Sequence, residues 1–386
     1  MFRHRPRPAA PAAFRTRTPH DHCRVPARPG RPIHPSPAAR FPARECTFDP
    51  GDWAILAQHW YPVALSREIG DSPVSVRLLD EPLVVYRANG RVVVANDICP
   101  HRGVPLSRGF SAGDGGGIRC AYHGLRFGEG GLCTDVPAHP AAKIPARLNL
   151  RDYPVVERYG LVWTCLRPSE EAREALGSPA IPAMAHWDDD GFQQITCPSI
   201  DIAAFAGRQL EGFLDVAHFG FVHLDSFGDP DNTEVPDYQP VRHERGFSVD
   251  YWSTASNYGH GSGKVAPPGF KWLRHFDVHL PFTATLVVHF PGGGRLNIMN
   301  AASPVSALTT RMFAPIARDF DTDQPVQGVY DFNRTVFEED RAIVEVQKPE
   351  NLPLDPRLEV HIPADRSSIA YRRGLRDLGL SHFFTA

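Results

Sequence analysis

The stretches CPHRG at 99–103 and CAYHG at 120–124 decide the fold of this chain. Each supplies one cysteine and one histidine, so together they read C-x-H, a gap of 18 residues, then C-x2-H. Two thiolates and two imidazoles in two short loops suit either a zinc ion or a two-iron cluster with the cysteines on one iron and the histidines on the other. Because zinc fingers and ribbons usually present like ligands in pairs, the mixed order favours the cluster. Gly103 and Gly124 would let backbone N–H groups approach its sulfides.

Length and charge bound the remaining possibilities. The chain has 386 residues, of which 42% are hydrophobic, enough for two or three domains. Its net charge is −3, but residues 1–44 hold ten arginines and one acid. The rest of the chain therefore has 31 basic and 43 acidic residues. A body that acidic argues against a nucleic-acid partner, because phosphates require a basic face.

The N-terminal segment and the cysteines indicate the setting of the protein. Residues 1–45 are rich in proline and arginine without apolar periodicity, which predicts a disordered tail. Ten prolines in this segment oppose the amphipathic helix of an organelle-targeting peptide. Seven cysteines, an odd number without a secretory signal, favour a reduced cytoplasmic location over a disulfide framework. We expect no membrane span, because no apolar run approaches about 18 residues.

The pattern of secondary structure changes near residue 168. Before it, short β-branched runs separated by Gly, Pro and Asp predict a small antiparallel β domain over 46–167. After it, the pattern predicts one helix at about 203–218 and a longer one at about 326–347, and strands that include 247–252, 283–290, 295–299 and 308–315. Strands followed by one long helix predict an α+β domain over 168–386, with that helix packed across an antiparallel sheet.

A second group of metal-binding residue types lies in RQLEGFLDVAHFGFVH at 208–223. Glu211, Asp215 and His218 are four and three residues apart and share one helix face. His223 would lie about 140° further round a regular helix, so the two imidazoles meet only if the helix breaks, and Gly220 stands where the break is needed. Two histidines beside a carboxylate form the facial triad that leaves open positions on non-haem Fe(II).

These motifs resemble those of the Rieske non-haem iron oxygenases. The resemblance implies that Cys99, His101, Cys120 and His123 hold a [2Fe-2S] cluster, and that His218 and His223 hold a mononuclear Fe(II). It makes Asp215 the bridge that carries electrons from the cluster of a neighbouring subunit to this iron. It also places Glu211 next to the iron ligands, without making it a ligand itself. The stretch FEEDRAIVEVQ at 337–347 resembles the family segment that supplies the third ligand, which implies Asp340. The neighbouring acids, Glu338, Glu339 and Glu345, fit a solvated helix face.

The resemblance also implies a fold, partners and an activity. The fold is a Rieske β domain followed by a helix-grip catalytic domain, in a head-to-tail homotrimer served by a separate NAD(P)H-dependent reductase or ferredoxin. The catalytic half is similar to vanillate and dicamba O-demethylases and pheophorbide oxygenases. This favours O2-dependent hydroxylation, or O- or N-demethylation, of a small aromatic or apolar substrate. The alternatives are cis-dihydroxylation of an arene, and a Rieske electron carrier with an unrelated C-terminal domain. In one departure, Gly212 stands where family members often carry asparagine, which would widen the pocket.

Overall fold

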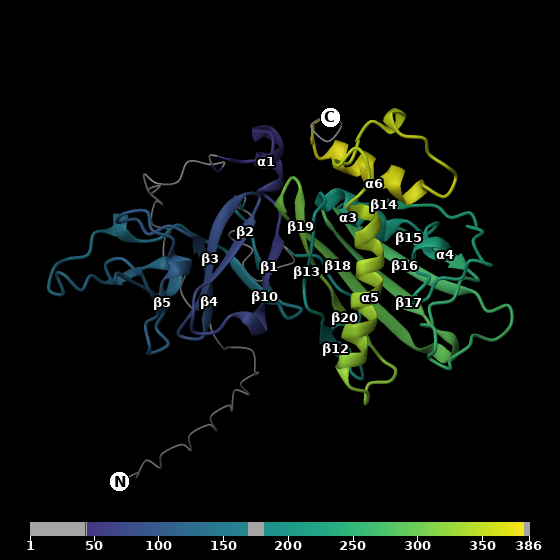
Figure 1. The fold of residues 1–386 in the computed structure, drawn as a ribbon, viewed down its shortest axis with the longest axis horizontal. Helices are drawn as coiled ribbons and strands as arrows, with labels where there is room; N and C mark the ends of the chain where they lie inside the picture. The colour runs from purple at the N-terminus through teal and green to yellow at the C-terminus, as the bar shows by residue number, and fades with distance from the viewer. Residues whose placement is uncertain (1–42, 44, 169–180, 382–386) are drawn as a thin grey trace, which may run out of the picture. The chain divides into compact units, whose positions relative to one another are not determined.

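The computed structural model describes residue 43 and residues 45–168 and 181–381. The predicted disordered tail, residues 1–45, lies almost wholly outside the described residues. The described chain forms a first region of small sheets and a second region built on one large sheet (Figure 1). Residue 168 remains our proposed boundary between them.

The first region contains three small sheets in which every pairing is antiparallel. It begins with helix α1 (Pro50–Leu56), at whose start the Asp49 carboxylate accepts a hydrogen bond of 2.7 Å from Gly51 N. In their order within each sheet, the strands are β1 (Tyr61–Leu65), β11 (Leu161–Thr164) and β10 (Val155–Arg158); β2 (Val74–Leu78), β3 (Glu81–Ala88), β4 (Arg91–Asn96) and β9 (Asp152–Tyr153); and β5 (Phe110–Ser111), β6 (Ile118–Arg119), β7 (Arg126–Phe127) and β8 (Cys133–Asp135). The predicted small antiparallel β domain is confirmed.

The second region is a nine-stranded antiparallel sheet. Its main path runs β12 (Gln193–Thr196), β20 (Pro315–Arg318), β18 (Arg295–Ser306), β17 (Thr283–His289), β16 (Trp272–His279), β15 (Gly246–Ser253) and β14 (Val241–His243). Strand β18 is long enough to pair with β20 near its start and with β19 (Thr309–Phe313) near its end, and β19 also pairs with β13 (Ile200–Ile202). The helices of this region therefore pack against one continuous sheet.

In the described part of the second region, four helices accompany this sheet: α3 (Ala206–Leu214), α4 (Phe219–Val222), α5 (Val326–Val344) and α6 (Arg366–Asp377). Figure 1 shows α5 running across the sheet. It buries Asn333, Phe337 and Val344, which recur at helical spacing on one face. The prediction of an α+β region with a long helix across an antiparallel sheet is confirmed. Single 3-10 turns lie at Ser66–Glu68, Leu106–Arg108, Glu129–Gly131, Ala146–Leu148, Pro291–Gly293 and Pro356–Leu358.

Several elements differ from their predicted bounds. The helix predicted at 203–218 ends at Leu214, because Asp215 adopts an extended backbone (φ −74°, ψ 131°) and its side chain accepts a hydrogen bond of 2.7 Å from Ala217 N. The strand predicted at 295–299 continues to residue 306. Strand β16 and helix α6 are not among the strands and helices predicted from the sequence. In β16 the buried side carries Arg274, a charge that interrupts the apolar alternation by which strands are recognised.

Candidate metal centres and the cavity beside them

Two histidines and one aspartate converge in the second region. His218 Nε2 lies 3.0 Å from His223 Nε2, and Asp340 Oδ1 lies 3.5 Å and 3.3 Å from those two nitrogens. Donor atoms at this spacing are all within reach of one cation with bonds of about 2.1 Å. The structure thus brings together the three residues that the resemblance assigns to iron, although they come from two distant parts of the chain.

The chain around α4 explains how two histidines five residues apart can meet. His218 and His223 stand immediately before and after the four residues of α4. The α-helical path breaks at Asp215, upstream of both, rather than at Gly220 as the sequence predicts. Gly220 lies inside α4, and its small size serves packing, because a Cβ there would lie 2.9 Å from the backbone oxygen of Asp229.

Each imidazole has a carboxylate at its other nitrogen. His223 Nδ1 lies 2.9 Å from Glu339 Oε2, and His218 Nδ1 lies 3.4 Å from Asp215 Oδ2. A carboxylate at Nδ1 holds the proton there and leaves the Nε2 lone pair available to a metal, while it also fixes the plane of the ring. Asp215 therefore lies where it can orient His218, and both histidines are prepared as ligands.

Glu339 is a residue of the site that the sequence analysis missed. Its carboxylate also accepts hydrogen bonds from Ser226 Oγ at 2.6 Å and from Asp225 N at 2.9 Å. Its side chain is only 10% exposed, so it does not belong to a solvated helix face. The signal that was available is its place directly before Asp340, but a run of three acids on a helix conceals which of them face inward.

The charges around His218, His223 and Asp340 favour the binding of a cation. Burial alone would lower the pKa of His218, but hydrogen bonds to Asp215 and Asp340 outweigh burial and raise this pKa to about 9. Burial raises the pKa of Asp215, yet its hydrogen bond to His218 prevails and holds that pKa below the usual range. Carboxylates that hold a proton on an imidazole in the absence of a metal supply the negative potential that a divalent cation requires. The donor set and its charge therefore fit iron.

The two motif loops of the first region separate their thiols from their imidazoles. Cys99 and Cys120 are 2% and 1% exposed, and they pack within a cluster of buried apolar side chains. His101 and His123 are exposed, with ring centroids 4.5 Å apart. This arrangement suits a cluster whose inner iron is held by cysteines and whose outer iron is held by histidines at the surface.

The backbone of the two loops follows one repeated pattern. Cys99 N donates to Val104 O at 2.8 Å, and Gly103 N donates to Cys99 O at 2.9 Å. The second loop repeats the glycine bond, from Gly124 N to Cys120 O at 3.0 Å. Both glycines have positive φ, 75° and 69°, which side chains rarely adopt. Each loop therefore turns tightly around its cysteine.

Backbone N–H groups also approach the Cys99 sulfur. Burial is the main influence and raises the pKa of the Cys99 thiol to about 11, while hydrogen bonds from the backbone N–H groups of His101 and Arg102 oppose this rise. Donors aimed at a buried sulfur stabilise the thiolate that ligates iron. The loop thus fits a bound [2Fe-2S] cluster.

Glu211 is placed differently from the expectation. It accepts hydrogen bonds from Arg372 Nε at 2.6 Å and Nη2 at 2.8 Å, and it lies 3.4 Å from Arg208 Nη1. Glu359 completes the network, 2.6 Å from both arginines. In the described part of the chain, the hydrogen bonds of Glu211 tie α3 to α6 and do not reach the candidate iron ligands. Glu211 is a buried structural residue here.

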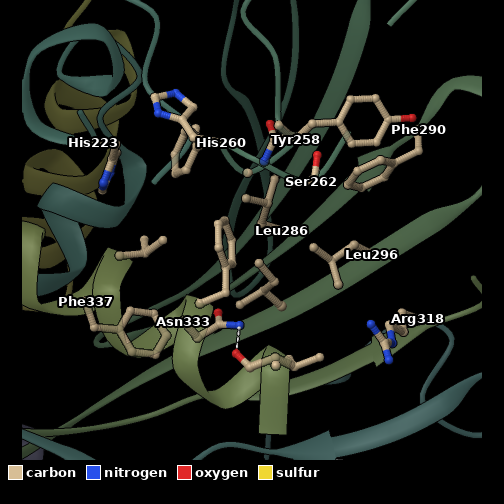
Figure 2. Close-up of a pocket in the computed structure, with 18 of the residues that line it drawn as sticks. His223, Tyr258, His260, Ser262, Leu286, Phe290, Leu296, Arg318, Asn333 and Phe337 are labelled. Atoms are coloured by element: carbon tan, nitrogen blue, oxygen red, sulfur yellow. Dashed lines mark hydrogen bonds between the residues drawn. The ribbon is translucent and has the colours of Figure 1, made fainter. Parts of the chain in front are cut away.

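A cavity of about 480 Å³ opens directly beside His218, His223 and Asp340. Its wall is mainly aromatic and aliphatic, as Figure 2 shows for Leu286, Phe290, Leu296 and Phe337. Gly212 contributes only backbone to this wall, at the position where family members often carry asparagine. His260 also lines the cavity, whereas His275 and His279 of β16 and His289 of β17 are not among its lining residues. This volume and lining are typical of a site for a small apolar ligand.

Comparison with known proteins identifies the family. The model of the Rieske [2Fe-2S] domain matches residues 59–154, and the model of the vanillate O-demethylase oxygenase C-terminal domain matches residues 202–380. The chain is 31% identical over 336 residues to methylxanthine N1-demethylase NdmA of Pseudomonas putida. These aligned residues cover 85% of this chain and 90% of that relative. The chain belongs to the Rieske non-haem iron oxygenases.

Other Rieske oxygenases show the same relationship. The oxygenase component of dicamba O-demethylase from Stenotrophomonas maltophilia is 47% identical over 105 residues, which cover 27% of this chain and 30% of that one. The solved structure of NdmA from Pseudomonas putida CBB5 with caffeine superposes with a TM-score of 0.72 at 29% identity and covers 84% of this chain and 91% of that chain. The predicted α+β architecture is that of the family.

Family membership decides several open alternatives. The chain carries a [2Fe-2S] cluster rather than zinc, and a mononuclear iron in its catalytic region. It is a terminal oxygenase and not an electron carrier with an unrelated C-terminal domain, because that domain matches an oxygenase model. Rieske oxygenases act with a separate reductase or ferredoxin. Among the described residues, no helix is both long and apolar enough to cross a membrane.

Proposed function

We propose that this Rieske oxygenase removes an O- or N-linked methyl group from a small aromatic substrate. The observation that carries the proposal is that His218, His223 and Asp340 converge at the wall of a largely apolar cavity of about 480 Å³. Such a cavity accepts a flat ring and positions one of its substituents beside the metal. Support comes from relatives whose names state N-demethylation or O-demethylation.

The residue roles in this proposal follow from the geometry. His218, His223 and Asp340 would hold the mononuclear iron, and the cluster would be held by Cys99, His101, Cys120 and His123. The iron, when bound, supplies the O2-dependent oxidising chemistry. Asp215 and Glu339 orient the two imidazoles, and the apolar wall excludes water from the reacting methyl group.

The proposed reaction balances as a monooxygenation. One oxygen atom of O2 enters a methyl C–H bond, and the other leaves as water after taking up two electrons and two protons. The resulting hydroxymethyl group breaks at its C–O or C–N bond and yields formaldehyde and the demethylated ring. The two electrons come from NAD(P)H through the separate reductase or ferredoxin.

We propose a head-to-tail homotrimer as the active assembly, in which the cluster of one subunit serves the iron of the next through Asp215. Exposed apolar side chains between α5 and α6 support an interface with another copy: Val346 is 67%, Leu358 57% and Val360 94% exposed. The experiment is a mass measurement by light scattering, which should give three times the 42.8 kDa of one chain. A monomeric mass with full turnover would contradict the assembly.

We also propose a cytoplasmic location. It is supported by the cysteines, because none of the six that the structure describes forms a disulfide.

The experiment that tests the activity supplies the purified enzyme with a surrogate reductase and a panel of methoxylated and N-methylated aromatic compounds. We expect at least one compound to give one formaldehyde for each NADH and each O2 consumed. A diol product would instead favour cis-dihydroxylation. Cluster reduction without any substrate-dependent O2 uptake across the panel would contradict the proposed reaction.

A further inference from the structure

The cavity contains a buried cation without an acidic partner. Arg318 ends β20 and lines the cavity, and it is only 8% exposed. Its Nε donates to Gln193 Oε1 at 2.9 Å and its Nη2 donates to Asp321 O at 2.8 Å. Both acceptors are neutral, and within the described residues Arg318 forms no ion pair and Nη1 makes no hydrogen bond. Donor capacity therefore remains on a guanidinium at the cavity wall.

The other arginine and the lysine of the cavity wall have different surroundings. Arg274 is fully buried, donates to Ser253 Oγ at 2.9 Å and to Ala255 O at 2.7 Å, and lies over the Phe219 ring at 5.4 Å. Lys264 forms an ion pair with the side chain of Asp321. Within the described residues Arg274 has no carboxylate partner either, and its buried Nε makes no hydrogen bond, but both of its terminal nitrogens donate. Arg318 differs from Lys264 because no carboxylate pairs with it, and it differs from Arg274 because its terminal nitrogen Nη1 makes no hydrogen bond.

The environment of Arg318 disfavours an isolated charge. Burial lowers the pKa of Arg318 and outweighs the opposing attraction of Asp321 and Asp323. A buried cation without a counter-ion is unfavourable, and an anion that binds it with two parallel hydrogen bonds offsets this cost. Arginine is better suited to this role than lysine because its planar fork matches a carboxylate or a sulfonate.

The position of Arg318 defines the part of a ligand that it would meet. In the view of Figure 2, Arg318 and His223 lie at opposite ends of the labelled side chains, with Leu286 and Leu296 between them. A ligand that reaches both ends therefore has an apolar body against these leucines, a polar group at Arg318 and a reacting group beside the metal ligands.

We propose that the natural substrate is an aromatic anion, with a carboxylate or sulfonate bound by Arg318 and the methyl group directed to the metal. This inference rests on the proposed demethylase function and adds the chemical class of its substrate. It assigns Arg318 as a specificity-determining residue. A purely structural role for Arg318, as a brace between Gln193 and the loop at Asp321, would give no preference for charged ligands.

The test uses matched pairs of probes that differ in charge and not in shape. Methoxybenzoates and N-methylaminobenzoates are compared with their amides by calorimetric titration into the anaerobic holoenzyme, where no turnover occurs. We expect the acids to bind about tenfold or more tightly than the amides, the usual worth of a charge-assisted contact. Arg318→Gln should remove the preference by weakening the acids, and Arg318→Lys should retain only part of it.

Controls separate recognition from folding and from catalysis. Arg311→Gln removes a positive charge from the same sheet at a residue already paired with Asp201, and it should keep the preference for acids. Cluster absorbance and iron content show whether Arg318→Gln is folded. The inference is overturned if no acid binds, if amides bind as well as acids, or if Arg318→Gln keeps the preference. If only neutral compounds give formaldehyde, this inference is wrong and the demethylase proposal stands. If acids bind through Arg318 but give no product, the demethylase proposal is wrong and the binding role of Arg318 stands.

Discussion

Glu339 and Asp340, consecutive residues of α5, reach opposite nitrogens of one imidazole. Glu339 Oε2 lies 2.9 Å from His223 Nδ1, and Asp340 Oδ1 lies 3.3 Å from His223 Nε2. One helix thereby supplies both a candidate metal ligand and the group that prepares the neighbouring ligand. Because His223 is 2% exposed, its ring has little freedom to rotate away from either carboxylate.

Removal of the Glu339 carboxylate should weaken the mononuclear iron site. Glu339→Ala leaves His223 Nδ1 without its acceptor, and loss of such a partner typically costs about 10- to 100-fold in metal affinity. Titration of iron-depleted protein with Fe(II) or Co(II) measures this affinity. Glu338→Ala is the matched control, because Glu338 is 52% exposed and, among the described residues, pairs only with Arg341 on the helix surface. Equal affinities for the two variants would contradict the role of Glu339.

Replacement of Asp340 should separate the two metal centres. Asp340→Ala removes one of three converging donors, and we expect iron to fall from about three atoms per chain to about two, because the cluster contributes two. The visible absorbance of the cluster and its reduction by the reductase should persist, while product formation is lost. Iron analysis and cluster absorbance on the same sample check this. Retention of all three iron atoms with full turnover would rule out Asp340 as a ligand.

Asp215→Asn should reduce turnover while both metal centres remain. The amide keeps the size of the side chain and removes the charge that holds a proton on His218 Nδ1. We expect a loss of about 10- to 100-fold in turnover. Rapid mixing of reduced enzyme with substrate and O2 then shows whether oxidation of the cluster has slowed. Unchanged cluster oxidation would remove Asp215 from the electron path.

Truncation of Glu211 should destabilise the fold rather than alter the chemistry. Arg208 and Arg372 have side chains that are 4% exposed, so in the described part of the chain Glu211→Ala leaves these two buried guanidinium groups with Glu359 as their remaining carboxylate partner. Removal of one member of a buried ion pair typically costs about 3–5 kcal/mol. Thermal and denaturant unfolding measure the loss, with Glu338→Gln as a surface control. A variant as stable as the parent but depleted of mononuclear iron would place Glu211 with the metal instead.

The same network predicts a loss of stability in acid. Burial raises the pKa of Glu359, but Arg208 and Arg372 outweigh it and hold this pKa below the usual range. A carboxyl whose pKa is lower in the folded state stabilises the fold above its unfolded pKa of about 4.3, and this contribution disappears as the pH falls through the folded value. The melting temperature should therefore decrease below about pH 4.3, and less steeply in Glu359→Gln. Identical slopes for the two proteins would contradict the coupling.

The cluster loops and the histidine pair could be predicted because their members are close in sequence. Cys99 and His101 share one short loop, as do Cys120 and His123, and the residue types in each loop already specify the ligand chemistry. The long helix and the antiparallel sheet followed from apolar periodicity. The position of the helix break did not, because a local hydrogen bond from Ala217 N to Asp215 competes with the helix more strongly than Gly220 interrupts it.

By itself, the sequence determined the family, the two regions and the residue types available to each metal. Only the tertiary structure decided which group each acidic side chain near the metal ligands contacts. Glu339 faces one nitrogen of His223 and Asp340 the other, while Glu211 turns away to Arg372. Likewise, the packing of β20 against the cavity left Arg318 without an acidic partner. The physical reason is that these contacts either join residues more than a hundred positions apart or depend on which residues a packed sheet brings together. The helical and strand periodicity of the sequence contains no information about either kind of contact.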